Sequence, residues 1–308
     1  MPTRDFYLIP GSCARSPHLG GIFSRIYARG GWGQSLPDVR HYYAASHKSA
    51  SGSGSELGAA TAPSARLLKL AISAYGCTSV MDVPCGDANW QFSSWEMDSL
   101  PVYVGLDVVP DLIALVKRRF AHHANKAFAT WDVTRCALPQ IHMGGRSTPA
   151  DLVQVRDLLQ HLSLANAKAA VRSVFAHGPR FVLATTYPRN ATNHRWPNHG
   201  PDRNPNLTWR PSAHDGDGAW TPYDVNMPPF DFPPPIECLS AHGLKNSQHD
   251  YDLVCLYSLN ASYASTWLRT VGGDELNVMV ALSRLGRSCA WSSVLPESPH
   301  KVFCRPSR

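Results

Sequence analysis

The sequence predicts an α/β fold with a doubly wound, Rossmann-like sheet that carries helices on both faces. Five short apolar runs alternate with helical patterns between residues 63 and 186, as in a parallel sheet. The first run ends in an acid, Asp82, and a sharp turn at Gly86. The second ends in another acid, Asp107, 25 residues after the first. Doubly wound sheets bind nucleotides at the carboxyl ends of such strands.

The composition is that of a soluble globular protein with one large domain and extensions. The 308 residues are 44% apolar and 17% charged, and they can bury a sizeable core. The net charge of +6 is scattered, and a solvated helix face explains the one basic run, Lys117 to Arg119. Nucleic-acid binding is therefore permitted but not indicated. No stretch suits a membrane span and no apolar leader is present, so we expect a cytoplasmic location by default.

The eight cysteines predict neither a zinc site nor a disulfide framework. No pair has Cys-x-x-Cys spacing, and their scatter in a large chain is typical of reduced thiols. Sequons for glycosylation occur at Asn190, Asn206 and Asn260. Chance alone gives a comparable number in a chain rich in Ser and Thr, so they are weak evidence for a secretory location.

The segment before the first strand has three parts. Residues 1–21 show no periodic pattern and are predicted to be a loose extension. For Ser51 to Glu56, a Gly/Ser stretch, composition alone favours a flexible linker. Pro63 to Tyr75 has the pattern of an amphipathic helix that Gly76 ends. The first strand is predicted at Ser79 to Val83.

The second predicted strand, Val102 to Asp107, ends in a carboxylate. Its place suits the acid that accepts hydrogen bonds from both ribose hydroxyls of a nucleotide. The alternative is a turn or cap carboxylate, because a predicted helix from Pro110 through Phe120 follows directly. The strand context favours the ribose role.

The third predicted strand, Ala127 to Trp131, is followed by Asp132. A carboxylate there could accept a hydrogen bond from an adenine amino group while Trp131 or Val133 packs on the ring. The Asp-Val-Thr sequence could equally be a plain turn.

The fourth predicted strand, Asp151 to Val155, is nearly all apolar, as a central parallel strand should be. If the segment beyond it is helical, Asp157 and His161 are four residues apart and share a face. The carboxylate could then hold the imidazole in one tautomer and raise its basicity. The spacing alone fits equally well a structural Asp–His contact that caps a helix, with Ser163 opening the next one.

The remaining pattern predicts a helix over Leu164–Ala176, a fifth strand over Phe181–Thr186 and a final strand over Asp250–Tyr257. The segment 187–235 is too long for an ordinary connection and is predicted to be a functional loop. Its aromatic residues could stack on sugar faces, although packing beneath the loop is the commoner fate of such rings. They are Trp196, Trp209, Trp220, Tyr223 and Phe230.

The turn after the first strand, Asp82-x-Pro84-Cys85-Gly86-Asp87-x-x-Trp90, carries a resemblance to a known family. It resembles motif I in one branch of the class I S-adenosylmethionine (SAM)-dependent methyltransferases, a branch common beside polysaccharide-modifying genes. The general motif has three glycines, and Pro84 and Ala88 replace two of them here.

Four further elements resemble this branch, and together they extend the resemblance over residues 22–260. They are Ile26-Tyr27 followed by Trp32-Gly33, the loop Ser51–Ser55, the sequence Arg156-Asp-x-x-x-His-Leu-Ser163, and Pro228–Pro235. Two departures are a long spacer between Trp32 and Ser51 and extra residues between Asn193 and Ala219.

The resemblance implies a methyltransferase domain over residues 22–260, with a cap and Ser/Gly loop (22–60) and an acceptor loop (187–235). Residues 261–308 form an extension without a motif. The cofactor-binding residues it implies are Asp82, Pro84, Cys85, Gly86, Asp87, Trp90, Asp107, Val108, Asp132, Val133 and Arg156. The substrate-binding residues are Ser53, Gly54, Ser55, Tyr187 and Phe230.

The implied reaction is transfer of the SAM methyl group to a sugar hydroxyl, without a metal. An alkyl hydroxyl is a poor nucleophile at neutral pH, so a general base is needed. The resemblance points to His161 as the base, with Asp157 and Arg156 as its catalytic partners. A glycan acceptor would also make the lumen of the secretory pathway a possible location.

Three other functions stay open. A nicotinamide-dependent dehydrogenase needs Gly-x-Gly-x-x-Gly after the first strand, which is missing. A methyltransferase could act on a small metabolite or on nucleic acid. A catalytically inactive SAM-binding protein is the third, because Pro84 and Ala88 depart from the general motif.

Overall fold

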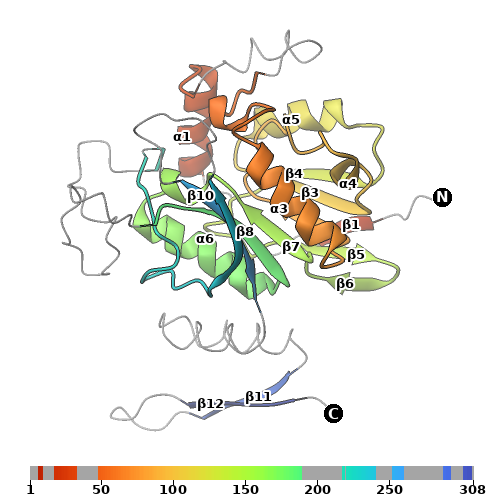
Figure 1. Cartoon of the computed structure of the whole chain (residues 1–308), viewed down its shortest axis with the longest axis vertical. Helices are drawn as coiled ribbons and strands as arrows, with labels where there is room; N and C mark the ends of the chain where they lie inside the picture. The colour runs from red at the N-terminus through yellow and green to blue at the C-terminus, as the bar shows by residue number, and fades with distance from the viewer. Residues whose placement is uncertain are drawn as a thin grey trace.

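The computed structural model describes the centre of the chain almost continuously. The described residues are 6–9, 17–32, 48–188, 217–218, 220–240, 252–259, 287–292 and 301–306. Their main element is a seven-stranded mixed sheet (Figure 1). Trp196, Trp209 and the three sequon asparagines lie outside the described residues.

The sheet has the strand order of a doubly wound fold. Across the sheet, its strands are β4 (Lys126–Thr130), β3 (Val102–Asp107), β2 (Ser79–Asp82), β7 (Leu152–Val155), β8 (Phe181–Thr186), β10 (Leu253–Ser258) and β9 (Pro235–Ser240). The first five are parallel, and β10 is antiparallel to both of its neighbours. The chain runs outward from β2 through β3 and β4 on one side and through β7 and β8 on the other. This confirms the predicted fold class and puts a ligand crevice where the order reverses, between β2 and β7.

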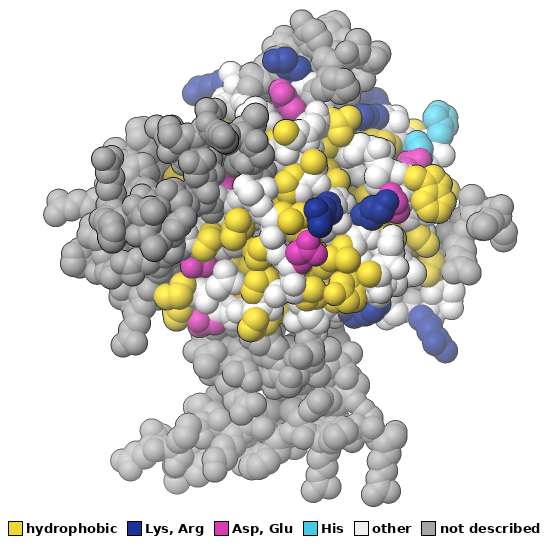
Figure 2. Space-filling model, in the orientation of Figure 1, with side chains coloured by type: hydrophobic (Ala, Val, Ile, Leu, Met, Phe, Trp, Pro, Cys, Tyr) yellow, Lys and Arg dark blue, Asp and Glu magenta, His cyan; other side chains and the backbone are white. Residues whose placement is uncertain are grey.

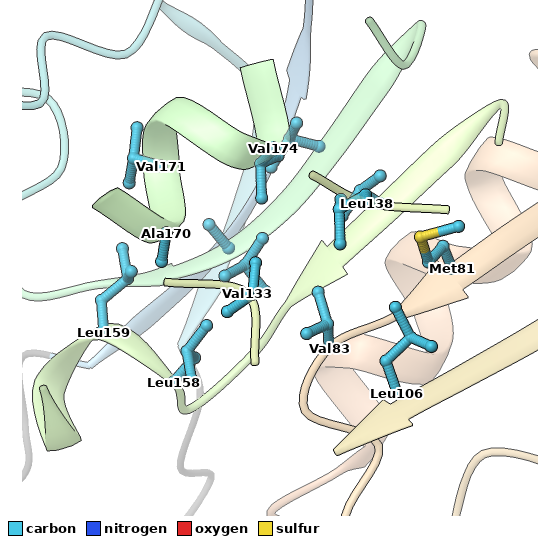
Figure 3. Close-up of a cluster of buried hydrophobic side chains, with 14 of the residues drawn as sticks. Met81, Val83, Leu106, Val133, Leu138, Leu158, Leu159, Ala170, Val171 and Val174 are labelled. Carbon is cyan, nitrogen blue, oxygen red and sulfur yellow. The ribbon is translucent and has the colours of Figure 1, made fainter. Parts of the chain in front are cut away.

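Helices cover both faces of the sheet (Figure 1). On one face, α3 (Ala62–Ser73) and α4 (Trp95–Asp98) pack in one hydrophobic cluster. On the other, α1 (Pro17–Ala28) and α6 (Leu164–His177) pack in a second cluster, part of which Figure 3 shows. The fifth helix, α5 (Pro110–Arg119), contributes side chains to both. Alternate residues of the central strands feed the two clusters, as in any sheet that is buried on both faces.

The face that Figure 2 shows carries charges of both signs among apolar side chains. Two ion pairs lie across α3, Lys69 with Glu96 at 2.6 Å and Arg66 with Glu237 at 3.6 Å. The described part of this face therefore presents no basic stripe of the kind that binds nucleic acid.

The N-terminal residues differ from the predicted loose extension. Strand β1 (Phe6–Ile9) pairs antiparallel with β5 (Gln140–Met143), which pairs with β6 (Arg146–Thr148). Helix α1 begins within the same region. A four-residue strand is too short to show a period, and the Gly20–Gly21 pair conceals the helix because glycine is a poor helix former. Gly20 lets α1 lie close to the sheet, since a Cβ there would be 3.2 Å from the Val108 carbonyl oxygen.

The prediction of reduced thiols is wrong for at least three cysteines. Cys238 in β9 lies directly opposite Cys255 in β10, with Cα atoms 4.1 Å apart, and the two form a disulfide. Cys136 is also disulfide-bonded. Cys77 and Cys85 are buried free thiols. Sequence spacing could not show the β9–β10 link, because it depends on which strands become neighbours.

The C-terminal extension contains a described hairpin, β11 (Arg287–Ser292) paired antiparallel with β12 (Lys301–Pro306). Among the described residues, no helix combines the length and the apolar character that crossing a membrane requires.

Candidate active site

A cavity of about 410 Å³ lies at the carboxyl ends of the central strands. Its wall comes from α1, the Ser/Gly loop, the turn after β2, the end of β3, the segment after β7 and the start of the acceptor loop. The predicted site residues that line it are Ser53, Gly54, Ser55, Pro84, Cys85, Gly86, Asp87, Trp90, Asp107, Val108, Arg156, Asp157, His161 and Tyr187. Asp82, Asp132, Val133 and Phe230 are not among its lining residues.

The turn after β2 requires glycine at position 86. Gly86 has a φ of 55°, in the left-handed region, and its N–H donates to Asp107 Oδ2 at 3.2 Å. A Cβ at this position would collide with the Ser51 hydroxyl. The geometry of the turn is thus set by two close neighbours as well as by φ.

Gly86→Ala is expected to remove ligand binding at this turn while the chain still folds. The substitution adds strain at positive φ, about 1–2 kcal/mol, and also displaces the Ser51 loop. Gly76→Ala is the matched control, because Gly76 has a φ of 65° with nothing near its would-be Cβ. Both variants should lower the thermal midpoint, but only Gly86→Ala should lose SAM affinity in calorimetry. Equal affinity in the two variants would remove Gly86 from the binding site.

Asp107 is a buried carboxylate that lines the cavity. It accepts hydrogen bonds from the backbone N–H groups of Gly86 (3.2 Å) and Val109 (3.0 Å). The pKa of Asp107 is raised to about 7. Burial is the main cause, the nearby Asp82 adds to it, and the two N–H donors oppose it. The site therefore holds an acceptor that ionises near neutral pH.

Asp82 lies beneath the turn, where it holds the surrounding polar side chains. Its carboxylate accepts from the Tyr103 hydroxyl (2.7 Å), Gln91 Nε2 (2.9 Å) and Gln154 Nε2 (2.8 Å). Burial raises the pKa of Asp82 to about 6 although these donors oppose the shift. Asp82 was expected to contact a cofactor, but it does not line the cavity. It instead accepts hydrogen bonds from Gln91 and Gln154, two side chains that do line it.

The Ser/Gly loop is part of the cavity wall and is tied to the turn after β2. The Asp87 carboxylate accepts from Ser49 Oγ at 2.9 Å and from the Ala50 N–H at 2.8 Å. Ser51 Oγ is 2.9 Å from the Tyr27 hydroxyl of α1. Residues Ser53–Ser55 form a short 3₁₀ helix, η1, in the cavity wall. These contacts distinguish the loop from a flexible linker.

Arg156 links the loop to the segment after β7. Its guanidinium donates to the Gly54 carbonyl at 2.6 Å, pairs with Asp157 at 2.8 Å and lies over the Trp90 ring at 5.5 Å. With its side chain 5% exposed, Arg156 serves mainly to hold these groups together.

The Asp157–His161 segment is not a continuous helix, which was the condition for the two residues to share a helix face. Asp157 has a φ of 53°, and a 3₁₀ helix, η2 (Leu159–His161), follows it. The Asp157 carboxylate accepts from Gln160 Nε2 and Thr185 Oγ1, each at 3.1 Å. Although burial opposes ionisation, the Arg156 guanidinium and the nearby His161 hold the pKa of Asp157 below its usual range. Asp157 and His161 still line one cavity, because both lie at the end of β7.

Tyr187 and Trp220 of the acceptor loop line the cavity together with Asp252, which lies just before β10. The Tyr187 and Trp220 rings meet edge to face at 5.5 Å. Burial, with the carboxylates of Asp157 and Asp252, raises the pKa of Tyr187 well above its usual value. Phe230 differs from its predicted contact with substrate: its side chain is fully buried and packs against Tyr223.

The end of β4 lies beside the cavity rather than in its wall. Asp132 Oδ1 accepts from the N–H and hydroxyl of Thr134, which is the plain turn considered above. Asp132 Oδ2 and Trp131 Nε1 are buried and have no hydrogen-bond partner. Val133 belongs to the hydrophobic cluster in Figure 3 and is not among the residues that line the cavity.

Sequence reasoning assigned no role to four polar residues that line the cavity: Gln91, Gln154, Gln160 and Asp252. Gln154 had a usable signal, since it is the one polar side chain in an otherwise apolar central strand. Asp252 had a weaker one. It directly precedes β10, whose antiparallel direction brings its first residue to the carboxyl edge of the parallel strands.

Comparison with known proteins gives only distant likenesses. No protein-family model and no curated protein sequence matches the chain. The N-methyltransferase NodS from Bradyrhizobium japonicum, bound to S-adenosylhomocysteine, matches at 14% identity and TM-score 0.40, over 63% of this chain and 83% of that one. Human N-acetylserotonin methyltransferase with SAM matches at 12% identity and TM-score 0.46, over 77% of this chain and 58% of that one. Magnesium protoporphyrin IX methyltransferase from Synechocystis with SAM matches at 10% identity and TM-score 0.44, over 80% of this chain and 100% of that one.

Likenesses at this level decide neither fold nor activity, and the fold rests on the sheet itself. Five parallel strands, an order that reverses between β2 and β7, and the antiparallel β10 beside β8 together define the Rossmann-like fold of class I methyltransferases.

Proposed function

We propose that this protein is a SAM-dependent methyltransferase that methylates a sugar hydroxyl. The observation that carries the proposal is the pairing of Gly86 with Asp107 where the strand order reverses. A turn that leaves no room for a side chain, next to an acid at the end of the second parallel strand, suits the ribose of a nucleotide-like cofactor.

The residues at the end of β4 also fit the cofactor. Asp132 Oδ2 and Trp131 Nε1 are buried without partners, and such groups are costly to leave unpaired. The backbone N–H of Trp131 donates to the backbone carbonyl of Asp107 at 2.8 Å, so the two residues adjoin the proposed ribose site. An adenine ring offers donors and acceptors that would satisfy them, and we assign these residues to it.

SAM, when bound, supplies a methyl group on a positively charged sulfur. His161 would take the proton of the acceptor hydroxyl, whose oxygen would receive the methyl group as SAM leaves as S-adenosylhomocysteine. Asp157 stabilises the positive charge that forms on the imidazole. Arg156 holds Asp157 and the Ser/Gly loop in place, which is the alignment that the reaction needs.

A sugar fits the acceptor end because that end combines aromatic rings with hydroxyl and carboxyl groups. Tyr187 and Trp220 offer apolar ring surface, and Asp252 and the hydroxyls of Ser53 and Ser55 offer hydrogen bonds.

Incubation of the purified protein with methyl-labelled SAM and a panel of neutral glycans tests the proposal. We expect label on a glycan hydroxyl, and a much lower rate of labelling with His161→Ala. Transfer only to small metabolites or nucleic acid would replace the sugar acceptor. SAM binding in calorimetry with no transfer to any acceptor would leave an inactive binding protein.

The disulfide chemistry bears on the compartment. The Cys238–Cys255 bond and the disulfide-bonded Cys136 favour an oxidising environment, such as the lumen of the secretory pathway, over the cytoplasm. A glycan acceptor is compatible with that location.

A further inference from the structure

We infer that Trp32 is a positioning residue that holds the His161 imidazole at the acceptor end of the cavity. This inference rests on the proposed function, in which His161 is the general base. Both residues line the cavity, and their ring centroids are 5.1 Å apart with the ring planes tilted by 43°. The contact joins the cap before the domain to the segment after β7, across more than a hundred residues of sequence.

His161 needs such a support because its own element is short. It is the last residue of the three-residue helix η2. The acceptor loop holds its backbone, through a 2.7 Å hydrogen bond from the Gly218 N–H to the His161 carbonyl. The half-buried imidazole can take more than one staggered rotamer, so what packs beside the ring decides its orientation. Trp32 supplies a flat surface on one side.

Trp32 is itself held on several sides. Its ring packs edge to face on Tyr27 at 5.2 Å and lies 5.8 Å from Phe23, and both of these residues are buried in the core. Gly31, just before it, donates its N–H to the Ile26 carbonyl at 2.9 Å and so closes the end of α1. The indole is therefore a fixed surface against which another ring can be placed.

The Ser/Gly loop also packs closely against Trp32. A Cβ at Gly52 would lie 2.8 Å from the Trp32 carbonyl oxygen, and Gly52 has a φ of 94°. Two independent constraints thus require glycine where the loop meets Trp32. The loop, the cap and His161 form one packed unit around the acceptor end.

The test compares Trp32→Ala with Trp95→Ala, a tryptophan on α4 that is 78% exposed. In single-turnover methyl transfer, Trp32→Ala should be slower by about tenfold to a hundredfold, as expected for a misplaced catalytic group. SAM affinity by calorimetry should stay within about twofold, and Trp95→Ala should change neither quantity. Trp32→Phe, which keeps a ring, should recover most of the rate.

A double-mutant cycle separates positioning from general packing. If Trp32 acts through His161, adding Trp32→Ala to His161→Ala should change the remaining rate by no more than about twofold. An undiminished loss in that background, or a parallel loss of SAM affinity, would overturn the inference. Should Trp32→Ala fail to fold, Trp32→Leu keeps apolar volume without a ring and carries the same comparison. Absence of transfer by the wild-type protein would instead refute the proposed function.

Discussion

Replacing His161 with alanine is expected to slow methyl transfer by about 10²–10⁴-fold, the usual loss when a general base is removed. The imidazole packs against Trp32, and the acceptor loop is hydrogen-bonded to the His161 backbone, so SAM affinity should change little. The measurement is single-turnover transfer of labelled methyl from SAM across a pH series, together with calorimetry of SAM binding.

Two further variants serve as a control and as a comparison for His161→Ala. His122→Ala removes an exposed histidine and should leave the rate unchanged. Asp157→Asn keeps the shape of the side chain but removes the charge that faces His161 and Arg156, so it should cost less than the loss of the base itself. If His161→Ala retains the wild-type rate across the series, the base lies elsewhere and the segment after β7 is structural.

Asp107→Asn is expected to weaken SAM binding by about 1–3 kcal/mol, because two ribose hydroxyls lose a charged acceptor. The wild-type affinity should also depend on pH. The pKa of Asp107 is raised to about 7, chiefly by burial. The ionised carboxylate is the form that can accept a hydrogen bond from each of the two ribose hydroxyls. Below that pH the free protein must release a proton to bind, so affinity should fall by up to about tenfold for each pH unit.

Calorimetry in buffers with different ionisation enthalpies checks the proton release directly. The ligand's own ionisable groups contribute equally in both proteins, so the difference between wild type and Asp107→Asn isolates the carboxylate. Asp111→Asn, an exposed acid in the first turn of α5, is the control. Unchanged affinity and an unchanged pH profile in Asp107→Asn would show that Asp107 does not face the cofactor.

The parts of the fold that were predictable are those in which neighbours in sequence decide the structure. The five parallel strands have apolar runs bounded by turn residues, and the bounds of Val102–Asp107 and Phe181–Thr186 agree with β3 and β8. The Gly86 turn was predictable for the same reason. Strand β9 and helix α4 were missed, because Pro235 and the four-residue length of α4 conceal their patterns.

Contacts between distant segments were not predictable from the residues alone. The Asp157–His161 spacing indicated a helix, but the Thr185 hydroxyl, which receives the Asp157 N–H at 3.0 Å, stabilises a left-handed residue there instead. Phe230 was expected in the acceptor pocket because it is aromatic, and only the packing of Tyr223 beside it shows otherwise. The Cys238–Cys255 bond likewise depends on the register of two strands.

The two buried carboxylates at the centre of the site contribute less to the stability of the ligand-free protein at neutral pH than in mild acid. Folding raises the pKa of Asp82 to about 6 and that of Asp107 to about 7, from about 4 in an unfolded chain. Between these values the two groups bind more protons in the native state than in the unfolded state, so their contribution to the free energy of unfolding falls as the pH rises from about 4 to 7. A ligand that donates hydrogen bonds to Asp107 offsets that loss. In the proposed methyltransferase, the cofactor would then complete the interior of the folded protein as well as supply the group that is transferred.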